Sequence, residues 1–308
     1  PHTQHTAIGT TQQCNTTQAI TMSNVADYYT VVGNPIAHSR SPWLHAKFAA
    51  QTQQSMRYDR SLLDIGNFAS GLSLLRANGL QGCNVTVPFK TDAFELAQWH
   101  SPAAILAQAC NTLWWDAGVL KADNTDGVGL VRDITHNAGF KLQGTRLLVI
   151  GAGGAGAGIL GPLIDAGCTH ILLANRTRTK ATEVVRRHTT LAQVRGCELS
   201  ATSLDDLNGS DQQAFDVVVN ASAASLGGQR IHLNDALFAP HTLAIDLMYG
   251  PSSRVFLNWA AERCNQTRDG LGMLVEQAAQ SFAIWRGSLP HTDNVLRELR
   301  LIVDAPAP

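Results

Sequence analysis

The chain has 308 residues, and at about 150 residues per domain this length favours two domains. Hydrophobic residues make up 44% of the chain, enough for a sizeable core, while 23 basic and 24 acidic side chains leave a net charge of −1. Binding to nucleic acid or to an anionic membrane requires clustered lysines and arginines, so the composition favours neither partner, and any anion site must be local.

Residues 1–24 differ from the rest of the chain, because they contain no Lys, Arg, Asp or Glu and are rich in Thr and Gln. With neither a positively charged start nor an apolar block, they do not resemble a secretory signal, and we interpret them as a disordered tail. The uncharged run 147–164 is long enough for a membrane span, but its six glycines and one proline argue against one. We therefore expect a cytoplasmic protein.

Six cysteines are spread along the chain without a C-x-x-C pair. This spacing is neither that of a zinc site nor that of a small disulfide-rich domain. We expect free thiols in a reducing compartment and no metal site.

The first half of the chain alternates apolar runs with helical segments that begin at turn residues. Ser41 followed by Pro42 is typical of a helix N-cap and first helical residue. We expect strands at 28–32, 82–87 and 113–120, the last broken at Asp116-Ala-Gly118, and helices at 41–51, 66–77, beyond Pro88, and from 124–127 to Gly139.

The pattern changes at Arg146. Short, fully apolar runs typical of strands buried on both faces now alternate with helical segments. This alternation predicts a parallel α/β sheet. The expected strands are 147–150, 171–174, 216–219 and 243–246, and two final helices are expected at 273–287 and 293–303.

A glycine-rich turn follows the first of these strands and opens a helix. Gly151, Gly153 and Gly156 fit the pattern G-x-G-x-x-G. The first glycine permits the tight turn, the second lets the backbone approach a pyrophosphate, and the third permits close packing of helix on strand. A mere packing turn is the alternative, but the flanking strand and helix favour a dinucleotide site.

The end of the second strand indicates which dinucleotide is bound. A site for NAD usually has an acidic residue there, which accepts a hydrogen bond from the ribose 2′-hydroxyl. Here Asn175-Arg-Thr-Arg-Thr-Lys180 contains no acid and three cations. A solvated basic helix start is the alternative, although the helix dipole disfavours cations at that position. The sequence favours NADP, whose 2′-phosphate requires positive charge.

Several polar residues outside this region are candidates for binding and proton transfer. Ser39 and Ser41 could hold a carboxylate, although either one alone is more often a helix cap. Asn84 and Thr86 alternate along an expected strand and so share one face. Lys90 and Asp126 each begin an expected helix; alone they would be a solvated lysine and a turn residue, but in one pocket they would form an acid–base pair.

Together these motifs resemble the shikimate dehydrogenases, NADP-dependent enzymes that reduce 3-dehydroshikimate in aromatic amino-acid (chorismate) biosynthesis. The resemblance covers about residues 28–300, and several motifs in the right order are more specific than any one alone. The matching segments are Gly33–Pro42, Asn84–Lys90, Asn111-Thr112, Asp123–Gly129, Gly151–Ala155, Asn175–Thr177, Asn220–Ser222 and Asp269–Met273.

The resemblance implies a role for each matching residue. Lys90 and Asp126 would be the catalytic pair. The substrate-binding residues would be Ser39 and Ser41 for the carboxylate, Asn84, Thr86, Asn111 and Gln277 for ring hydroxyls, and Tyr249 at the border of the substrate. The cofactor-binding residues would be Gly151, Gly153, Gly154, Ala155, Asn175, Arg176, Thr177 and Lys180, with Gly270 and Met273 near the nicotinamide.

The resemblance also implies an architecture of two α/β domains. A substrate domain would comprise 25–126 and 271–308, whose C-terminal helices return to it, and a Rossmann-type, doubly wound parallel sheet in 127–270 would bind NADP. Three alternatives remain: relaxed use of quinate or NAD, a catalytically inactive metabolite-binding regulator of the same fold, and an NADP reductase for another hydroxy acid. Either a monomer or a homodimer is compatible with the sequence.

Overall fold

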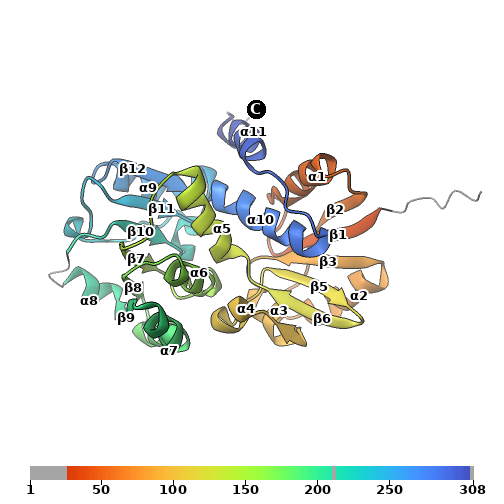
Figure 1. Ribbon diagram of the computed structural model, residues 1–308, viewed down its shortest axis with the longest axis horizontal. Coiled ribbons are helices and arrows are strands. Elements are labelled where there is room, and N and C mark those ends of the chain that lie inside the picture. Colours follow the sequence, from red (N-terminus) through yellow and green to blue (C-terminus); the bar gives the residue numbers. More distant parts are fainter. Residues whose placement is uncertain (1–25, 210–212, 306–308) are drawn as a thin grey trace, which may run out of the picture.

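The computed structural model describes residues 26–209 and 213–305, so the expected tail at 1–24 lies outside the described residues. Figure 1 shows two sheets, each flanked by helices, with α5 (Asp126–Arg132) and α10 (Leu271–Arg286) running between them. The expected α/β fold with two domains is confirmed. In the described part of the chain, no helix is both long and apolar enough to cross a membrane.

The first sheet has the order β2-β1-β3-β5-β6-β4. Strands β1, β2 and β3 pair in parallel, whereas β5 and β6 form an antiparallel hairpin through Ala117 and Gly118, both with positive φ. Its strands are β1 (Asp27–Gly33), β2 (Met56–Leu62), β3 (Leu80–Val85), β4 (Trp99–His100), β5 (Thr112–Asp116) and β6 (Val119–Asp123), and its helices are α1 (Ser41–Gln51), α2 (Phe68–Ala77), α3 (Lys90–Leu96) and α4 (Pro102–Ala107).

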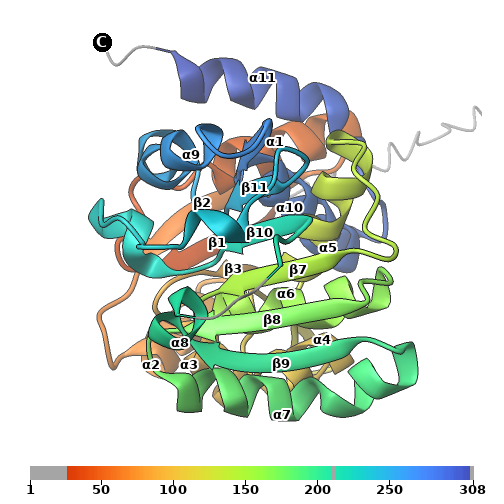
Figure 2. The same cartoon turned by 90° about the vertical axis from the view of Figure 1, so that its left-hand side faces the viewer.

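The second sheet is entirely parallel and has the order β12-β11-β10-β7-β8-β9, the doubly wound order of Rossmann folds. Figure 2 shows β9, β8, β7, β10 and β11 in succession. The strands are β7 (Arg146–Ile150), β8 (His170–Asn175), β9 (Glu198–Ser203), β10 (Val217–Asn220), β11 (Leu243–Asp246) and β12 (Gln266–Asp269), and the helices are α6 (Gly154–Asp165), α7 (Arg178–Arg195), α8 (Leu204–Asn208) and α9 (Arg254–Ala261), with short 3₁₀ turns η2 (Ala223–Gly227), η3 (Asp235–Leu237) and η4 (Gly250–Ser253).

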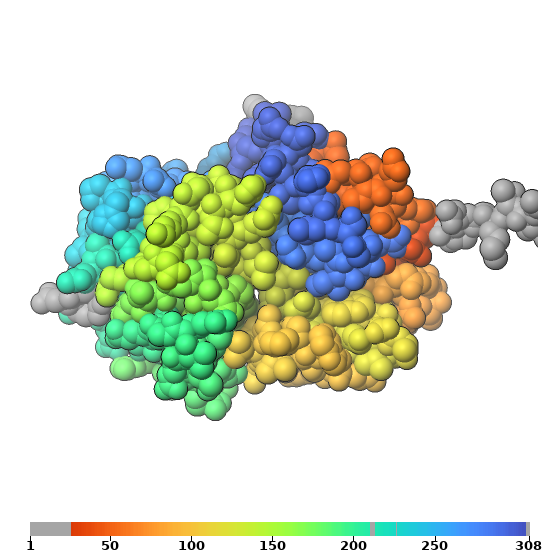
Figure 3. Space-filling model, viewed as in Figure 1, coloured from red at the N-terminus to blue at the C-terminus, as the bar shows by residue number. Residues whose placement is uncertain are grey.

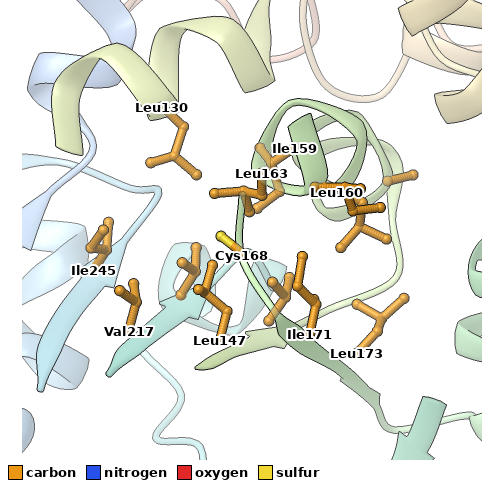
Figure 4. Packing of buried hydrophobic residues seen from close by; sticks show 14 of the residues in the cluster. Leu130, Leu147, Ile159, Leu160, Leu163, Cys168, Ile171, Leu173, Val217 and Ile245 are labelled. Carbon is orange, nitrogen blue, oxygen red and sulfur yellow. The ribbon is translucent and has the colours of Figure 1, made fainter. Parts of the chain in front are cut away.

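Strand β7 is apolar throughout because both faces of this sheet are covered. Leu147 and Val149 belong to the core beneath α6, whereas Leu148 and Ile150 belong to the core on the opposite face. Figure 4 shows the first core, with leucine and isoleucine side chains of α6 and Leu130 of α5 pointing toward the strands.

The last helices return to the first sheet, as expected. Leu271, Val275 and Phe282 of α10 pack with Leu44 and Phe48 of α1, and α11 (Asp293–Asp304) closes this cluster. Figure 3 shows α10 in blue and the α5 region in yellow-green between the two halves of the molecule. Both sheets are therefore joined through α5 and α10.

Glycines let α5 approach both of its neighbours. A methyl group at Gly127 would lie 2.5 Å from the carbonyl oxygen of Gly158 in α6, and one at Gly129 would lie 2.7 Å from the backbone nitrogen of Gln277 in α10. Beyond α5 the chain continues as the π-helical turn η1 (Asp133–Asn137). The helix expected from 124–127 to Gly139 is thus an α-helix followed by a π-turn.

Two local expectations need correction. Arg40, and not Ser41, is the N-cap of α1, and Ser41 is its first helical residue. The sequence interpretation also overlooked β2, β4, β9 and β12, which contain polar or charged residues and lack a continuous apolar run.

Candidate active site

Lys90 and Asp126 lie side by side at the junction of the two halves. Lys90 Nζ donates a hydrogen bond to Asp126 Oδ2, and their side chains are only 15% and 6% exposed. Each residue is the first of its helix, α3 and α5, and the backbone N–H of Cys110 donates to the Lys90 carbonyl oxygen at 2.9 Å. The structure therefore brings together the two residues expected to form an acid–base pair.

Asn111 holds the aspartate from the other side. Its Nδ2 lies 2.9 Å from Asp126 Oδ1 and 3.0 Å from Gln277 Oε1, and its Oδ1 accepts from the Thr125 N–H at 2.9 Å. Asn111 and Asp126 are buried, so neither is free to turn toward solvent. Asn111 and Gln277, which are expected to bind the substrate, thus also fix the position of the Asp126 carboxylate.

Asn84 lies next to Asn111, and both polar atoms of its side chain are hydrogen-bonded to other protein groups. Its Oδ1 accepts from the Tyr58 hydroxyl at 2.7 Å and from His45 Nε2 at 3.2 Å, while its Nδ2 donates to Ser281 Oγ at 2.9 Å and to the Asn111 carbonyl oxygen at 3.1 Å. Burial lowers the pKa of His45 to about 3, so its ring is neutral. Asn84 therefore connects the first sheet to α10.

Thr86 differs from Asn84 in its surroundings. It lies just beyond the end of β3, is half-buried, and uses its backbone N–H to bond the Val32 carbonyl oxygen at 2.9 Å. In the described part of the chain no group hydrogen-bonds its side-chain hydroxyl, which leaves that hydroxyl available to a ligand.

Ser39 and Ser41 form a compact pair of hydroxyls ahead of α1. Ser39 Oγ donates to Ser41 Oγ at 3.2 Å and accepts from the Ser41 N–H at 3.3 Å. The Ser41 side chain also lies against the Tyr58 phenol. A continuous polar path therefore runs from this pair through Tyr58, Asn84 and the Asn111 region to the aspartate.

Tyr249 comes from the second half of the chain and packs on the α1–α10 cluster. Burial raises the pKa of its phenol, and the nearby Arg40 and Arg60 partly oppose this effect. Among the described residues none hydrogen-bonds its hydroxyl. The phenol is therefore a free donor within electrostatic reach of Arg40 and Arg60.

The glycine-rich loop adopts the geometry that the sequence predicts. Gly151 has φ +109°, and a methyl group there would lie 2.9 Å from the Ser222 nitrogen. A methyl group on Gly156 would lie 1.9 Å from the Gly151 carbonyl oxygen, whereas one on Gly153 would meet nothing within 4 Å. Gly153 thus leaves an open cradle at the N-terminus of α6, which fits a pyrophosphate.

The glycine-rich loop also borders Lys90, which contacts Asp126. A methyl group on Gly154 would lie 3.6 Å from Lys90 Cβ, and Ala155 packs against the core beneath α6. A ligand on the loop would therefore extend toward Lys90.

We expect opposite results from two alanine substitutions in this loop. Gly156→Ala should destabilise the protein by about 1–3 kcal/mol, because the methyl group forces the turn apart. Gly153→Ala should change stability by less than about 0.5 kcal/mol but weaken dinucleotide binding, since its methyl group would occupy the open cradle. Thermal denaturation and dinucleotide titration measure the two effects, and a strongly destabilised Gly153→Ala would contradict the assignment.

The residues after β8 are arranged for an anion. Asn175 Oδ1 accepts from the Ala152 N–H at 3.2 Å and so ties this segment to the glycine-rich loop. Arg176, Thr177 and Lys180 are exposed, and among the described residues neither cation has a carboxylate partner. These positions fit a 2′-phosphate.

The remaining expected residues lie at the start of α10 or on one face of it, which also carries Ser281. Gly270 precedes the helix, and a methyl group there would lie 2.1 Å from the Leu247 carbonyl oxygen. Met273 is buried in the core beneath α6, Gln277 lies one turn later beside Asn111, and Ser281 follows after another turn. The spacing of four residues puts the last three on one helix face.

The sequence interpretation gave no role to several residues that position this site: His45, Tyr58, Thr112, Thr125 and Ser281. Two of them follow helical spacing, because His45 lies four residues after Ser41 and Ser281 four residues after Gln277. That spacing could have identified both.

Known proteins are similar to this chain along most of its length. Residues 31–113 match the family described as shikimate dehydrogenase substrate binding domain, residues 133–244 match shikimate / quinate 5-dehydrogenase, and residues 270–300 match the shikimate 5′-dehydrogenase C-terminal domain. A protein of Verminephrobacter eiseniae named shikimate dehydrogenase (NADP(+)) is 50% identical over 287 residues, which cover 93% of this chain and 98% of the relative.

Solved structures of similar proteins share the fold of this chain along most of its length. An Ael1 enzyme from Pseudomonas putida superposes with a TM-score of 0.81 at 38% identity, covering 91% of this chain and 99% of that one. A shikimate 5-dehydrogenase from Thermus thermophilus in complex with NADP(H) and shikimate superposes with a TM-score of 0.74 at 28% identity, covering 89% and 98%.

Proposed function

This chain belongs to the shikimate dehydrogenase family, and from that premise we propose that Lys90 and Asp126 are the acid–base pair of its reaction. The enzyme is an NADP-dependent oxidoreductase that reversibly reduces 3-dehydroshikimate to shikimate, a step in aromatic amino-acid (chorismate) biosynthesis. The observation that carries the assignment of the pair is their direct contact beside the glycine-rich loop.

Lys90 moves the proton of the reaction. When bound, NADPH supplies a hydride to the carbonyl carbon of the substrate. The Lys90 ammonium donates a proton from Nζ to the carbonyl oxygen, which becomes the hydroxyl group, and in the reverse direction the neutral amine accepts that proton. Asp126, held by Asn111, keeps the amine oriented and stabilises its charged form.

The substrate-binding residues surround this pair. We assign the substrate carboxylate to Ser39 and Ser41, whose hydroxyls lie together, the border of the substrate to Tyr249, and the ring hydroxyls to Thr86, Asn111 and Gln277. We also count Asn84 among the substrate-binding residues. Its polar atoms already have protein partners, so it acts by holding Tyr58 and Asn111 in position.

The residues around the glycine-rich loop fit the cofactor, NADP. Gly151, Gly153, Gly154 and Ala155 would hold the pyrophosphate, and Asn175, Arg176, Thr177 and Lys180 the adenosine phosphate. Gly270 and Met273 would lie near the nicotinamide. The open side of Gly153 supports this assignment, as do Arg176 and Lys180, which have no carboxylate partner in the described part of the chain.

Removing one of those cations should alter the choice of cofactor. Arg176→Ala is expected to raise KM for NADP⁺ about tenfold, because a charge-assisted contact to the phosphate is lost, and to leave KM for NAD⁺ unchanged. Steady-state kinetics with both cofactors measure this effect. Arg195→Ala is the control, since Arg195 lies at the far end of α7, the helix that follows Arg176, and pairs with Asp165. An equal rise for both cofactors would refute the assignment.

The reaction itself is tested by mixing the protein with shikimate and NADP⁺ and following the absorbance of the reduced nicotinamide. Rapid turnover with this pair, and little with quinate or NAD⁺ in parallel, is the expected result. Turnover with quinate or NAD⁺ instead would overturn the proposed substrate or cofactor specificity, but it would leave the roles of Lys90 and Asp126 unchanged. No turnover by folded protein would favour a metabolite-binding regulator or a reductase for another hydroxy acid.

The organisation of the enzyme completes the proposal. We divide it into a substrate domain, 25–126 with 271–308, and an NADP domain, 127–270. We infer a cytoplasmic enzyme, which the five free, buried cysteines of the described region support. Size-exclusion chromatography with light scattering distinguishes a monomer from a homodimer.

A further inference from the structure

Arg60 supports the serine pair from the edge strand β2. Its Nε and Nη2 donate to the Ser39 carbonyl oxygen at 2.9 and 2.7 Å. Because side chains alternate along a strand, Arg60 shares a face with Tyr58, which reaches Asn84. The guanidinium is thus fixed on the backbone of Ser39, whose hydroxyl, together with that of Ser41, is assigned to the substrate carboxylate.

No carboxylate among the described residues neutralises the charge of Arg60. In residues 26–209 and 213–305 it pairs with no carboxylate, and its positive charge acts on the Tyr249 phenol together with that of Arg40. Arg57, on the same strand, is different: it pairs with Asp59 at 3.1 Å and lies over the Tyr28 ring. Only the first of these two strand arginines presents a net charge to the serine pair.

We propose that Arg60 is a specificity-determining residue, which selects substrates with an ionised carboxylate by placing an uncompensated guanidinium behind the Ser39 carbonyl. The hydroxyls of the serine pair supply hydrogen bonds, which an ester or amide oxygen could also accept. The arginine adds an attraction that only an anion experiences. This inference rests on the proposed function and adds to it the basis of charge selection.

The test compares shikimate with its methyl ester, which has the same ring but no charge. In the wild type, kcat/KM for the acid should exceed that for the ester. Arg60→Gln should lower the acid/ester ratio about fivefold, as expected for the loss of one partly exposed charge interaction, mainly through KM for the acid. Arg60→Lys should restore the ratio, and Arg57→Gln should leave it unchanged.

Other outcomes would overturn the inference. Equal losses for acid and ester in Arg60→Gln would mean that Arg60 only supports the loop, and an Arg60→Lys ratio as low as that of Arg60→Gln would exclude a role for charge. A wild type without turnover of shikimate and NADP⁺ would instead refute the proposed function.

Ionic strength gives a second measurement that does not depend on the loop geometry. Salt should raise KM for the acid more steeply in the wild type than in Arg60→Gln, because screening weakens an attraction that the variant lacks. Identical salt dependence in the two proteins would also contradict the proposal.

Discussion

Lys90→Ala is expected to lower kcat about 10²–10⁴-fold, the range for loss of a general acid, while KM for shikimate changes much less. The reason is that the lysine contacts Asp126 in the free enzyme and transfers a proton only during the reaction. Stopped-flow and steady-state measurements of nicotinamide absorbance, together with circular dichroism to verify the fold, give the result.

A matched lysine controls for the loss of a cation in the same domain. Lys121 pairs with Asp116 in the β5–β6 hairpin, so Lys121→Ala removes a lysine–aspartate pair that is more exposed and lies outside the proposed site. Its kcat should stay close to that of the wild type. Near-native turnover of Lys90→Ala would show that another group transfers the proton.

Glu276→Ala is expected to lower the free energy of unfolding by about 3 kcal/mol, because it removes the buried acceptor of three hydrogen bonds, one of them from a charged arginine. Glu276 is fully buried in α10, accepts from Arg132 at 2.7 Å and from Thr292 at 2.8 Å, and also contacts Asn137 of the π-turn. Removing it leaves these donors without their acceptor. Chemical denaturation followed by Trp fluorescence measures the change.

Glu298→Ala is the control for this substitution. Glu298 lies in the next helix, α11, and its ion pair with Lys47 is exposed, so its loss should change stability by less than about 1 kcal/mol. Similar, small effects for both variants would mean that the buried network contributes little to the stability of the junction.

The sequence predicted the nucleotide-binding half well because its pattern is local. Apolar strands such as β7 and β10 are buried on both faces, and Gly151 and Gly156 are required by contacts within the loop or with residues just beyond β10. By contrast, β12, with the sequence QTRD, is half exposed at the sheet edge and has no apolar signal. Its position follows from pairing with β11, which only the folded chain defines.

The candidate site was predictable only in part, because most of its contacts join residues that are far apart in the sequence. Motif resemblance supplied Lys90 and Asp126, but nothing local in the sequence relates residues 36 positions apart. The residues behind them were missed because their partners are remote: Ser281 Oγ lies 2.9 Å from Asn84 Nδ2 across 197 positions of the chain. Hydroxyl-bearing residues of this kind are common on helices, so their role depends on tertiary contacts.

The contacts of α5 also limit how the two halves could be exchanged between relatives. A chimera that takes residues 127–270 from a donor parent and the rest of the chain from a recipient would combine the aspartate of one parent with the α5 glycines of the other. Gly129 of the donor would then have to fit the Gln277 backbone of the recipient, where a methyl group already has no room. Recombinants that inherit α5 and α10 from the same parent should retain activity more often than those that separate them.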